Sequence, residues 1–375
     1  METRAAVLWD SPAERPYAKT RPLSIETLRL DPPGDGEILV RIGAAGLCHS
    51  DLSVINGDRP RPLPMALGHE AAGVVEQVGR GVSDLEPGDH VVMVFVPSCG
   101  YCAPCQEGRA ALCEPGAQAN GAGTLLSGGL RLHRDDTDVK HHVGVSGFAE
   151  RAVVSRRSAV KIDPEIPLPK AALFGCAVLT GMGAVVNTCG LRSGETVAVI
   201  GLGGVGLSAV LGAVAGGATE VIAVDLADHK LEFAERLGAT ATVNAGDPDA
   251  VDKIRRAAGK GVHHAIETAG VRQAFEMAYA VTRRGGQTVT ASLANPDSYV
   301  SIQHVNLVAE ERTVRGSYLG GGVPSRDIPR FMALWKQARL PVERLMTSEG
   351  SLDDINAGFD ALAEGTTVRH VLHIG

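Results

Sequence analysis

Four of the chain's seven cysteines fall within fifteen residues, at a spacing that suits a metal ion. They form a C-x2-C-x2-C-x7-C run made of Cys99, Cys102, Cys105 and Cys113. Neighbours this close are difficult to join in two disulfides, whereas four thiolates readily surround a tetrahedral Zn²⁺. Because the chain supplies all four ligands, no position is left for chemistry, and we expect a structural zinc that folds a protruding lobe. Buried free cysteines are the alternative.

A second, more dispersed set could hold a metal that does chemistry. Cys48 lies in GLCHSD, His69 in GHE and Cys176 in GCAVLTG. Ligands this far apart converge only in a folded domain, so spacing alone leaves ordinary core cysteines and a core histidine as an equal alternative. If they converge, three protein ligands leave a fourth position for water or an alcohol oxygen, as in a catalytic zinc site. Asp51 is placed to accept a hydrogen bond from His69. The remaining Cys189 is expected in the core.

A glycine-rich turn further along the chain predicts a dinucleotide site. A strand predicted at Thr196–Ile200 leads into G-x-G-x-x-G, formed by Gly201, Gly203 and Gly206, with Gly204 inside the motif. The first glycine permits a tight turn, the second lets the backbone approach a pyrophosphate, and the third lets the following helix pack closely on the strand. The helix N-terminus then offers free N–H groups to the phosphates.

An acidic residue after the glycine turn indicates which dinucleotide is bound. Asp225 ends the next apolar run, 19 residues after Gly206. A carboxylate there hydrogen-bonds the adenosine ribose and repels a 2′-phosphate, so NAD is favoured over NADP. Lys230, one helical turn further on, is expected to reach the ribose as well. A packing turn without a ligand is the alternative.

Two different patterns of predicted secondary structure along the chain indicate two domains. The first 160 or so residues contain short Val/Ile runs separated by Pro/Gly turns, which is typical of β-structure. From residue 195, strands and helices alternate, which predicts a parallel, doubly wound sheet. The tail at 367–374 is expected to form a strand that rejoins the first domain. The fold class is therefore α/β.

Composition excludes several functions. The net charge is −7 and the basic residues are scattered, so a nucleic-acid partner is not expected. The segment Thr196–Thr219 carries no charge over 24 residues, yet its seven glycines indicate a buried βα unit rather than a membrane span. The first residues contain no apolar core of signal-peptide length, and a cytoplasmic location is expected. Clustered cysteines are there more often metal-bound than disulfide-bonded.

At these residues the chain resembles the zinc-dependent, medium-chain alcohol dehydrogenases over essentially its whole length. The pattern Gly68-His-Glu-x2-Gly73-x5-Gly79-x2-Val82 fits the zinc signature of that family, and the four-cysteine run has the family's spacing. The order of the motifs also fits. The resemblance implies a β-rich, GroES-like catalytic domain at 1–177 and 321–375, and a Rossmann domain at 178–320.

The resemblance also implies roles for individual residues. Cys48, His69 and Cys176 would hold a catalytic zinc, with Glu70 as an occasional extra ligand. Ser50 would hydrogen-bond the substrate hydroxyl and take its proton. The remaining implied positions are Thr180 and Val205 against the nicotinamide, Arg369 at the pyrophosphate, Phe95 in the alcohol pocket, and His49 where an arginine often touches the pyrophosphate.

Some positions depart from the family's pattern. Well-known members end the proton relay with a histidine, whereas the corresponding position here is Ser53, so protons would leave through Ser50, the ribose and water, or through His49. His142 stands where a large apolar pocket residue is expected, and Arg59 near the pocket mouth; for both, a solvated surface position is the favoured alternative. The long segment between residues 113 and 144 is similar to that of dimeric members and favours a homodimer.

The resemblance implies an oxidoreductase that uses two zinc ions and NAD to interconvert primary alcohols, aromatic or medium-chain, and aldehydes. A thiol-adduct formaldehyde dehydrogenase is the first alternative, although Arg59 and Ala117 differ from the acidic and arginine residues of its glutathione-using members. A polyol dehydrogenase usually lacks the third ligand cysteine, and Cys176 is present. A non-enzymatic, NADPH-binding relative similar to the lens crystallins would lack the zinc ligands.

Overall fold

The computed structural model describes all residues from 1 to 375, and the chain divides into two compact units. The first unit contains Met1–Cys176, Val323–Arg330 and Met346–Gly375. The second contains Ala177–Gly322 and Phe331–Leu345. The expected domains, 1–177 with 321–375 and 178–320, differ from this division mainly at residues 331–345.

The physical reason for this difference is where the apolar side chains of residues 331–345 are buried. Phe331, Leu340 and Val342 are at most 1% exposed. The short 3₁₀ turn Val342–Leu345 packs against helix α7 (Gly204–Ala215), a helix of the second unit. The sequence does not show which unit residues 331–345 pack against, because an apolar stripe on a helix can be covered by more than one surface.

Two β-structures form the first unit. A closed barrel has the strand order β1-β2-β7-β8-β4, and a seven-stranded sheet has the order β10-β6-β5-β3-β18-β17, with β9 also paired to β3. The strands are β1 (Glu2–Leu8), β2 (Leu23–Leu30), β3 (Glu37–Gly46), β4 (Met65–Ala66), β5 (Glu70–Val78), β6 (His90–Met93), β7 (Leu132–Arg134), β8 (Thr137–His141), β9 (Arg151–Ser155), β10 (Ala159–Ile162), β17 (Met346–Ser351) and β18 (Arg369–His373).

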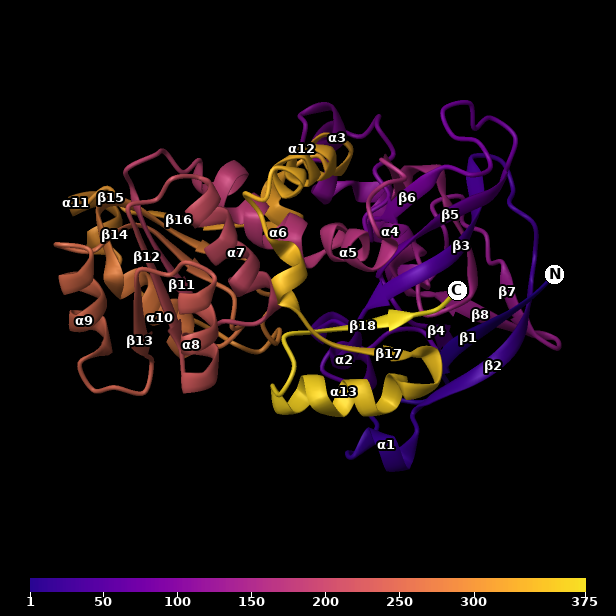
Figure 1. The fold of residues 1–375 in the computed structure, drawn as a ribbon, viewed down its shortest axis with the longest axis horizontal. Coiled ribbons are helices and arrows are strands. Elements are labelled where there is room, and N and C mark those ends of the chain that lie inside the picture. Colours follow the sequence, from indigo (N-terminus) through magenta and orange to yellow (C-terminus); the bar gives the residue numbers. More distant parts are fainter. The chain divides into compact units, whose positions relative to one another are not determined.

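Strand β3 is the centre of the first unit. Nine of its ten residues are buried, as expected for a strand covered on both faces. The C-terminal strand β18 pairs antiparallel with it, Leu372 opposite Ala45, and the yellow and indigo strands lie side by side in Figure 1. The tail therefore joins the first unit, as its sequence indicated.

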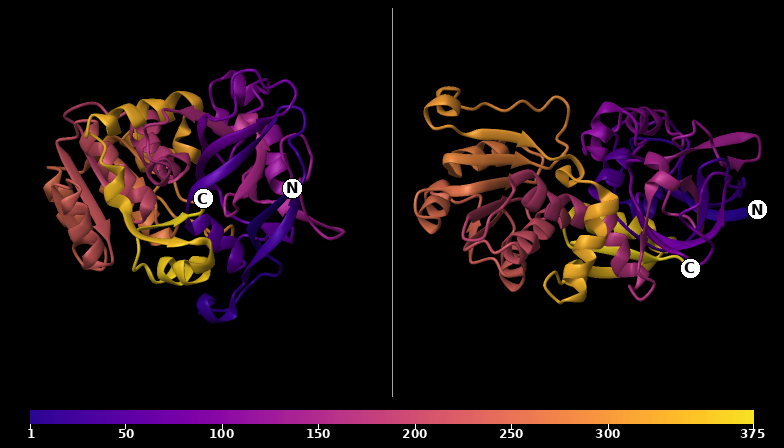
Figure 2. Two further views of the ribbon diagram at one scale, coloured as in Figure 1. Left: turned by 45° about the vertical axis from the view of Figure 1, so that its right-hand side comes forward. Right: turned by 90° about the horizontal axis from the view of Figure 1, so that it is seen from above.

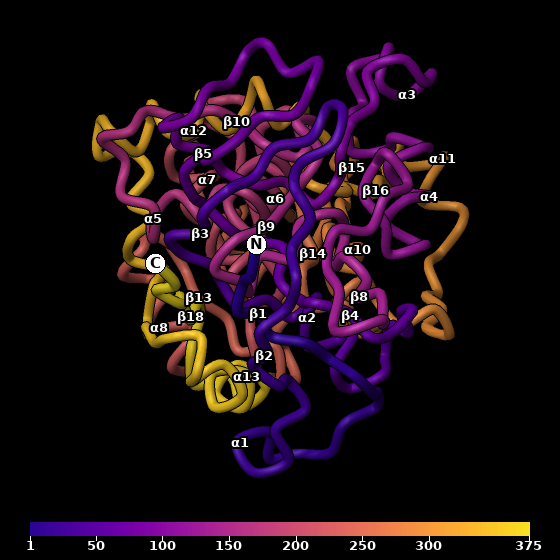
Figure 3. The backbone as a smooth tube through the Cα atoms, turned by 90° about the vertical axis from the view of Figure 1, so that its right-hand side faces the viewer, coloured from indigo at the N-terminus to yellow at the C-terminus, as the bar shows by residue number.

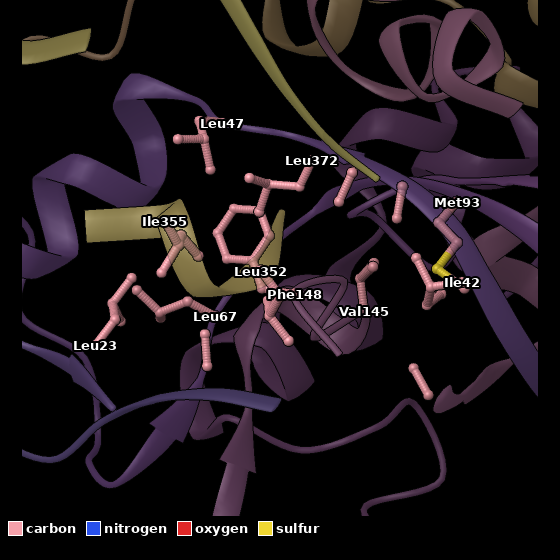
Figure 4. Packing of buried hydrophobic residues seen from close by; sticks show 14 of the residues in the cluster. Leu23, Ile42, Leu47, Leu67, Met93, Val145, Phe148, Leu352, Ile355 and Leu372 are labelled. Carbon is pink, nitrogen blue, oxygen red and sulfur yellow. The ribbon is translucent and has the colours of Figure 1, made fainter. Parts of the chain in front are cut away.

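An apolar core fills the space beside this sheet. Figure 4 shows Phe148 among aliphatic side chains from the strands and from the C-terminal segment, including Leu352, Ile355 and Leu372. Phe148 is fully buried and packs edge-on against Phe359, with ring centroids 6.0 Å apart. This core fixes the loops and helix ends that carry the functional residues of the first unit.

The helices of the first unit are short and stand at its edges. They are α1 (Tyr17–Thr20), α2 (His49–Ile55), α3 (Ala103–Gln106), α4 (Glu114–Ala122), α5 (Leu168–Ala172) and α13 (Ile355–Glu364). Helix α3 belongs to the four-cysteine segment, which projects from the edge of the tube in Figure 3. A protruding lobe was expected there.

The second unit is a doubly wound, parallel sheet with the strand order β13-β12-β11-β14-β15-β16. Its strands are β11 (Thr196–Ile200), β12 (Glu220–Asp225), β13 (Ala241–Asn244), β14 (Val262–Glu267), β15 (Thr282–Thr290) and β16 (Thr313–Gly316). Besides α7, its helices are α6 (Ala177–Gly183), α8 (Asp228–Arg236), α9 (Ala250–Ala257), α10 (Arg272–Val281) and α11 (Val305–Ala309); α12 (Pro324–Lys336) runs through both units. The two views in Figure 2 show these strands and their helices in pink to orange.

Helices cover both faces of the central strand β11. Ala198 and Ile200 pack on one face in a cluster with Ile254 of α9 and Ala278 of α10. Val199 on the other face is also fully buried, and α7 packs there against β11. Strands buried on both faces have continuous apolar sequences, which is why this strand could be located from the sequence to the residue.

No helix of the structure is by itself both long and apolar enough to cross a bilayer. One bent pair, Leu168–Gly175 with Ala177–Cys189, meets the length and composition criteria. The uncharged segment Thr196–Thr219 forms β11, the glycine turn and α7, as expected for a buried βα unit.

Candidate zinc and dinucleotide sites

The four clustered cysteines converge at the projecting lobe. Their sulfur atoms all lie within 4.8 Å of one another, and none is joined in a disulfide. The Sγ atoms of Cys99 and Cys105 are 4.0 Å apart, close to the roughly 3.8 Å edge of a tetrahedron with Zn–S bonds of about 2.3 Å. Backbone N–H groups of Cys99 and Gly116 point at the sulfur of Cys113, at 3.2 and 3.3 Å. Donors aimed at sulfur suit thiolates, so the lobe fits a structural zinc.

The dispersed set also converges, entirely within the first unit. The ligand atoms of Cys48, His69, Glu70 and Cys176 lie within 4.8 Å of one another, and each of these residues is at most 6% exposed. The buried His69 Nε2 and Glu70 Oε2 atoms have no hydrogen-bond partner. Buried polar atoms rarely lack partners, and here they face two sulfur atoms. The donor set therefore fits a zinc ion with Cys48, His69 and Cys176 as ligands and Glu70 beside them.

Local backbone structure places each of these ligands. Cys48 is the N-cap of α2, where its sulfur accepts from the N–H of Asp51. His69 precedes β5 and follows Gly68, which has φ +97°; a Cβ added to Gly68 would lie 2.4 Å from the backbone nitrogen of Phe148. Only glycine fits there, because the turn needs positive φ and close approach. Cys176 lies in the short break before α6.

Charges in the pocket shift the protonation of its groups strongly. A hydrogen bond from the Cys176 thiol lowers the pKa of Cys48 well below its usual range, and the same bond raises the pKa of Cys176. Burial alone would lower the pKa of His69, but the negative charges of Asp51 and Cys48 outweigh it and raise that pKa. Two cysteine sulfurs and carboxylates confined in a buried volume make a site whose negative charge a divalent cation would compensate.

Glu70 is held from behind by an arginine. The Arg369 guanidinium donates to Glu70 Oε1 at 2.9 Å and to the carbonyl of Leu47 at 3.0 Å, and both charged side chains are at most 3% exposed. Burial raises the pKa of Glu70, and Arg369 opposes that shift. The sequence-based expectation that Arg369 contacts a pyrophosphate stays a prediction. The structure shows that its side chain also has a buried carboxylate partner, a pairing between residues 299 apart in sequence that spacing could not reveal.

The expected contact between Asp51 and His69 is present. His69 Nδ1 lies 2.9 Å from Asp51 Oδ1, and the N–H of Cys48 donates to Asp51 Oδ2 at 3.2 Å. Phe95 meets the His69 ring edge to face, with centroids 5.4 Å apart. Phe95 was expected in the alcohol pocket and lies beside a ligand of the candidate zinc.

His142 is placed differently from the favoured expectation of a solvated surface residue. It is 3% exposed, its Nδ1 lies 3.1 Å from Asp51 Oδ1, and its ring meets that of His69 edge to face at 5.5 Å. The turn at His142–Gly144 brings it there. One signal was present in the sequence, a polar residue where a large apolar one was expected, but that signal did not identify the partner.

Helix α2 carries the other residues expected near the reaction. Ser50 is half-buried in its first turn, two residues after Cys48, and His49 is exposed. The hydroxyl of Ser53, at the position where the resemblance led us to expect a histidine, donates to the carbonyl of His49 at 2.8 Å. Arg59 is half-buried just beyond the helix, with its N–H on the carbonyl of Ser53.

The glycine turn of the second unit has the geometry of a phosphate cradle. Gly201 has φ +94°, and a Cβ at Gly206 would lie 1.8 Å from the carbonyl oxygen of Gly201, so helix and strand touch there. A Cβ at Gly203 would meet nothing within 4 Å, which leaves room for a ligand at that point. Helix α7 begins at Gly204 without a side-chain cap, so its first N–H groups remain available to an anion.

Asp225 closes one side of this turn. Its carboxylate accepts from the N–H of Leu202 at 2.7 Å and from that of Ala227 at 3.1 Å, and Lys230 Nζ lies 4.0 Å away. It therefore ties the end of β12 to the glycine turn. Thr180 is buried in α6, and Val205 lies half-buried in the first turn of α7. The donor-rich turn and the acidic residue fit a dinucleotide.

Comparisons with known proteins agree with this fold. Residues 34–164 match the family described as "Alcohol dehydrogenase GroES-like domain", and residues 204–337 match "Zinc-binding dehydrogenase". The chain is 39% identical over 380 residues, 99% of each chain, to a protein named NDMA-dependent alcohol dehydrogenase from Amycolatopsis methanolica.

Two solved structures are similar along their whole length. An alcohol dehydrogenase zinc-binding domain protein from Burkholderia ambifaria has a TM-score of 0.94 and 35% identity, covering 100% of this chain and 99% of that one. A benzyl alcohol dehydrogenase from Acinetobacter calcoaceticus has a TM-score of 0.93 and 30% identity, covering 100% of both.

The fold and the two cysteine sites thus define a zinc-binding dehydrogenase with a GroES-like and a Rossmann-type domain. The chain belongs to the zinc-dependent, medium-chain alcohol dehydrogenase family, as its sequence resemblance indicated. It is an oxidoreductase, and the relatives described above are named as alcohol dehydrogenases.

Proposed function

We propose that this chain is a zinc- and NAD-dependent dehydrogenase that interconverts primary alcohols and aldehydes. The observation that carries the proposal is the buried group of Cys48, His69 and Cys176, with an unpartnered His69 Nε2 facing the two sulfur atoms. A structural or non-enzymatic relative would have no reason to keep such an open donor set.

The chain's own residues orient and deprotonate the substrate. When bound, zinc would polarise the alcohol oxygen as a Lewis acid, and NAD would accept the hydride at its nicotinamide. Ser50, two residues after Cys48 on α2, accepts the hydroxyl proton as the hydride leaves the carbinol carbon, so that alcohol and NAD⁺ give aldehyde, NADH and one proton. The exposed His49 on the same helix turn, or water, carries that proton away.

The substrate class we propose is aromatic or medium-chain primary alcohols. Phe95 lies edge-on against His69, which puts an aromatic wall next to the candidate metal. Such a wall favours flat, apolar substrates. The structural likeness to a protein named benzyl alcohol dehydrogenase supports the same class.

The cofactor we propose is NAD. The open space above Gly203 and the uncapped start of α7 suit a pyrophosphate, and the Asp225 carboxylate opposes a 2′-phosphate. One relative is named NDMA-dependent, so NDMA is the second acceptor that any assay should contain.

The proposal is tested by measuring oxidation of ethanol, hexanol, benzyl alcohol and geraniol with NAD and, separately, with NDMA. Formaldehyde with and without a low-molecular-weight thiol completes the panel. We expect NADH formation with a free alcohol and the highest kcat/KM with benzyl alcohol or hexanol. Turnover only with NDMA would overturn NAD as a co-substrate that is released after each turnover, and turnover only with formaldehyde plus thiol would overturn the substrate assignment.

We propose further that two chains associate through the edge of the sheet in the second unit. Strand β16 is the last strand of that sheet, and all four of its residues are exposed. Apolar side chains gather along the same stretch of chain, with Tyr299, Val308 and Val314 exposed by 80%, 78% and 38%. Strand β16 pairs with β15 on one side only, and the open edge of such a strand, with apolar neighbours, is a template for a second strand that a two-fold copy supplies.

A further inference from the structure

His142 is a buried imidazole that the proposed reaction does not use. It is 3% exposed and stands on the turn after β8, far in sequence from the zinc ligands. Burying an imidazole without a partner is unfavourable, so its position needs a physical reason. The acceptor within reach of its Nδ1 is Asp51 Oδ1, at 3.1 Å, although the ring is not well aligned for a hydrogen bond.

The same carboxylate oxygen also receives His69. Asp51 is completely buried, and three groups approach it: the imidazoles of His69 and His142 at its Oδ1, and the N–H of Cys48 at its Oδ2. No arginine or lysine neutralises this carboxylate by a direct ion pair. A buried carboxylate depends on every donor around it, so losing His142 would change how Asp51 holds its remaining partners.

His142 and Phe95 also confine the ring of His69. Both rings meet the His69 imidazole edge to face, at interplanar angles of 84° and 88°. His69 must present Nε2 to Cys48 and Cys176 while Nδ1 remains on Asp51. Ring packing alone limits its translation, whereas the bond to Asp51 fixes its rotation.

We propose that His142 is a positioning residue, which acts through Asp51 to hold His69 in the orientation that binds the catalytic zinc. This inference rests on the zinc site of the proposed function. The donor set Asp51, His69 and His142 could itself be taken for a metal site, since its three ligand atoms lie within 4.8 Å. However, His69 Nδ1 and Asp51 Oδ1 are already 2.9 Å apart, at hydrogen-bond distance, which a metal between them would break.

The test compares three variants of the zinc-loaded protein. His142→Phe keeps a ring against His69 but removes the N–H group that faces Asp51. His142→Asn replaces that donor with an amide N–H at a similar distance from the backbone. His373→Gln alters an exposed histidine of the same unit, 50% exposed and paired with Glu349, and serves as the control.

Two measurements report on the metal without using turnover. The first is the rate at which a chelator removes each zinc ion, and the second is the visible absorption of protein in which Co²⁺ replaces the catalytic zinc. We expect His142→Phe to lose one zinc at least about 10-fold faster than the unmodified protein and to shift the Co²⁺ bands. His142→Asn should restore most of both properties, and His373→Gln should change neither.

Each outcome separates the inference from the proposed function. If the unmodified protein binds two zinc ions but His142→Phe keeps both at the original rate with unchanged Co²⁺ bands, the positioning role is wrong. If His142→Asn behaves as His142→Phe does, ring packing rather than the donor matters, which also overturns it. An unmodified protein that binds only one zinc would instead refute the proposed function itself.

Discussion

Individual residues build both candidate sites from polar groups that depend on one another. Asp51 orients His69, and Arg369 holds Glu70 against the same pocket at 2.9 Å. Such pairs hold ligand atoms in place before a metal arrives, which lowers the ordering cost of binding. The dinucleotide site follows the same rule, since Asp225 is fixed by the N–H groups of Leu202 and Ala227.

Replacing Asp225 should change the choice of cofactor. In Asp225→Ser the carboxylate that we propose to receive the ribose and to repel a 2′-phosphate is gone, so we expect kcat/KM with NAD to fall about 10–100-fold and the ratio of kcat/KM with NADP to kcat/KM with NAD to rise. Steady-state kinetics with both cofactors and one alcohol measures this. An unaltered ratio in Asp225→Ser would show that Asp225 only supports the glycine turn.

Reasoning from the sequence identified those functional residues that lie in local motifs. The contact of Asp51 with His69 and the convergence of Cys48 and Cys176 were expected and are present. The partners of Arg369 and His142 were not found, because contacts between residues far apart in sequence depend on how β18 and the turn after β8 pack. Periodicity and spacing do not encode such packing.

Among the structural elements, the glycine turn before α7 contains one glycine that packing requires and one that faces open space. A Cβ at Gly206 would lie 1.8 Å from the Gly201 carbonyl oxygen, whereas a Cβ at Gly203 would meet no atom within 4 Å. Packing therefore requires Gly206, whereas the space at Gly203 is open, and we expect a bound dinucleotide to require that glycine.

The pair Gly203→Ala and Gly206→Ala tests this distinction. We expect Gly203→Ala to melt at the same temperature as the unmodified protein without cofactor, but to bind NAD at least about 10-fold more weakly, because a methyl group enters the phosphate position. Gly206→Ala should also lower the melting temperature. Titration with NAD, followed by fluorescence, measures the affinity, and thermal unfolding measures the melting temperature. Equal NAD affinity in Gly203→Ala would place the pyrophosphate elsewhere.

The four-cysteine lobe should depend on its metal for stability rather than for chemistry. We expect Cys102→Ala to lose one zinc ion and about 4–8 °C of melting temperature, because metal binding supplies the folding free energy of such a lobe. Cys189→Ala, at a buried cysteine outside both metal sets, should keep both zinc ions. Unchanged melting with both zinc ions retained in Cys102→Ala would contradict a structural zinc.

Elements were easiest to predict where burial is two-sided. Strand β11 has the bounds expected from the sequence, and the strand at the tail is β18. By contrast, residues 331–345 were expected with the first domain and pack in the second unit, since an amphipathic stripe fits more than one surface. Tertiary packing decides such cases.

For the whole molecule, the exposed strand β16 predicts the assembly. We expect light scattering to give twice the chain's mass of 39.0 kDa, and Val314→Asp to yield monomers, because a buried charge at the paired edge is costly. Val214→Asp is the matched control, since Val214 on α7 is exposed by 40% against 38% for Val314. A Val314→Asp protein that remains dimeric would move the interface to another surface.

We propose that alcohol oxidation by the whole enzyme depends on a zinc ion held by Cys48, His69 and Cys176. The decisive experiment follows NADH formation from benzyl alcohol by the unmodified protein and by Cys176→Ala, with zinc counted in both. We expect two zinc ions and turnover in the first, and one zinc ion, an intact fold and a kcat lower by more than about 100-fold in the second. Full activity in Cys176→Ala would contradict oxidation at this zinc.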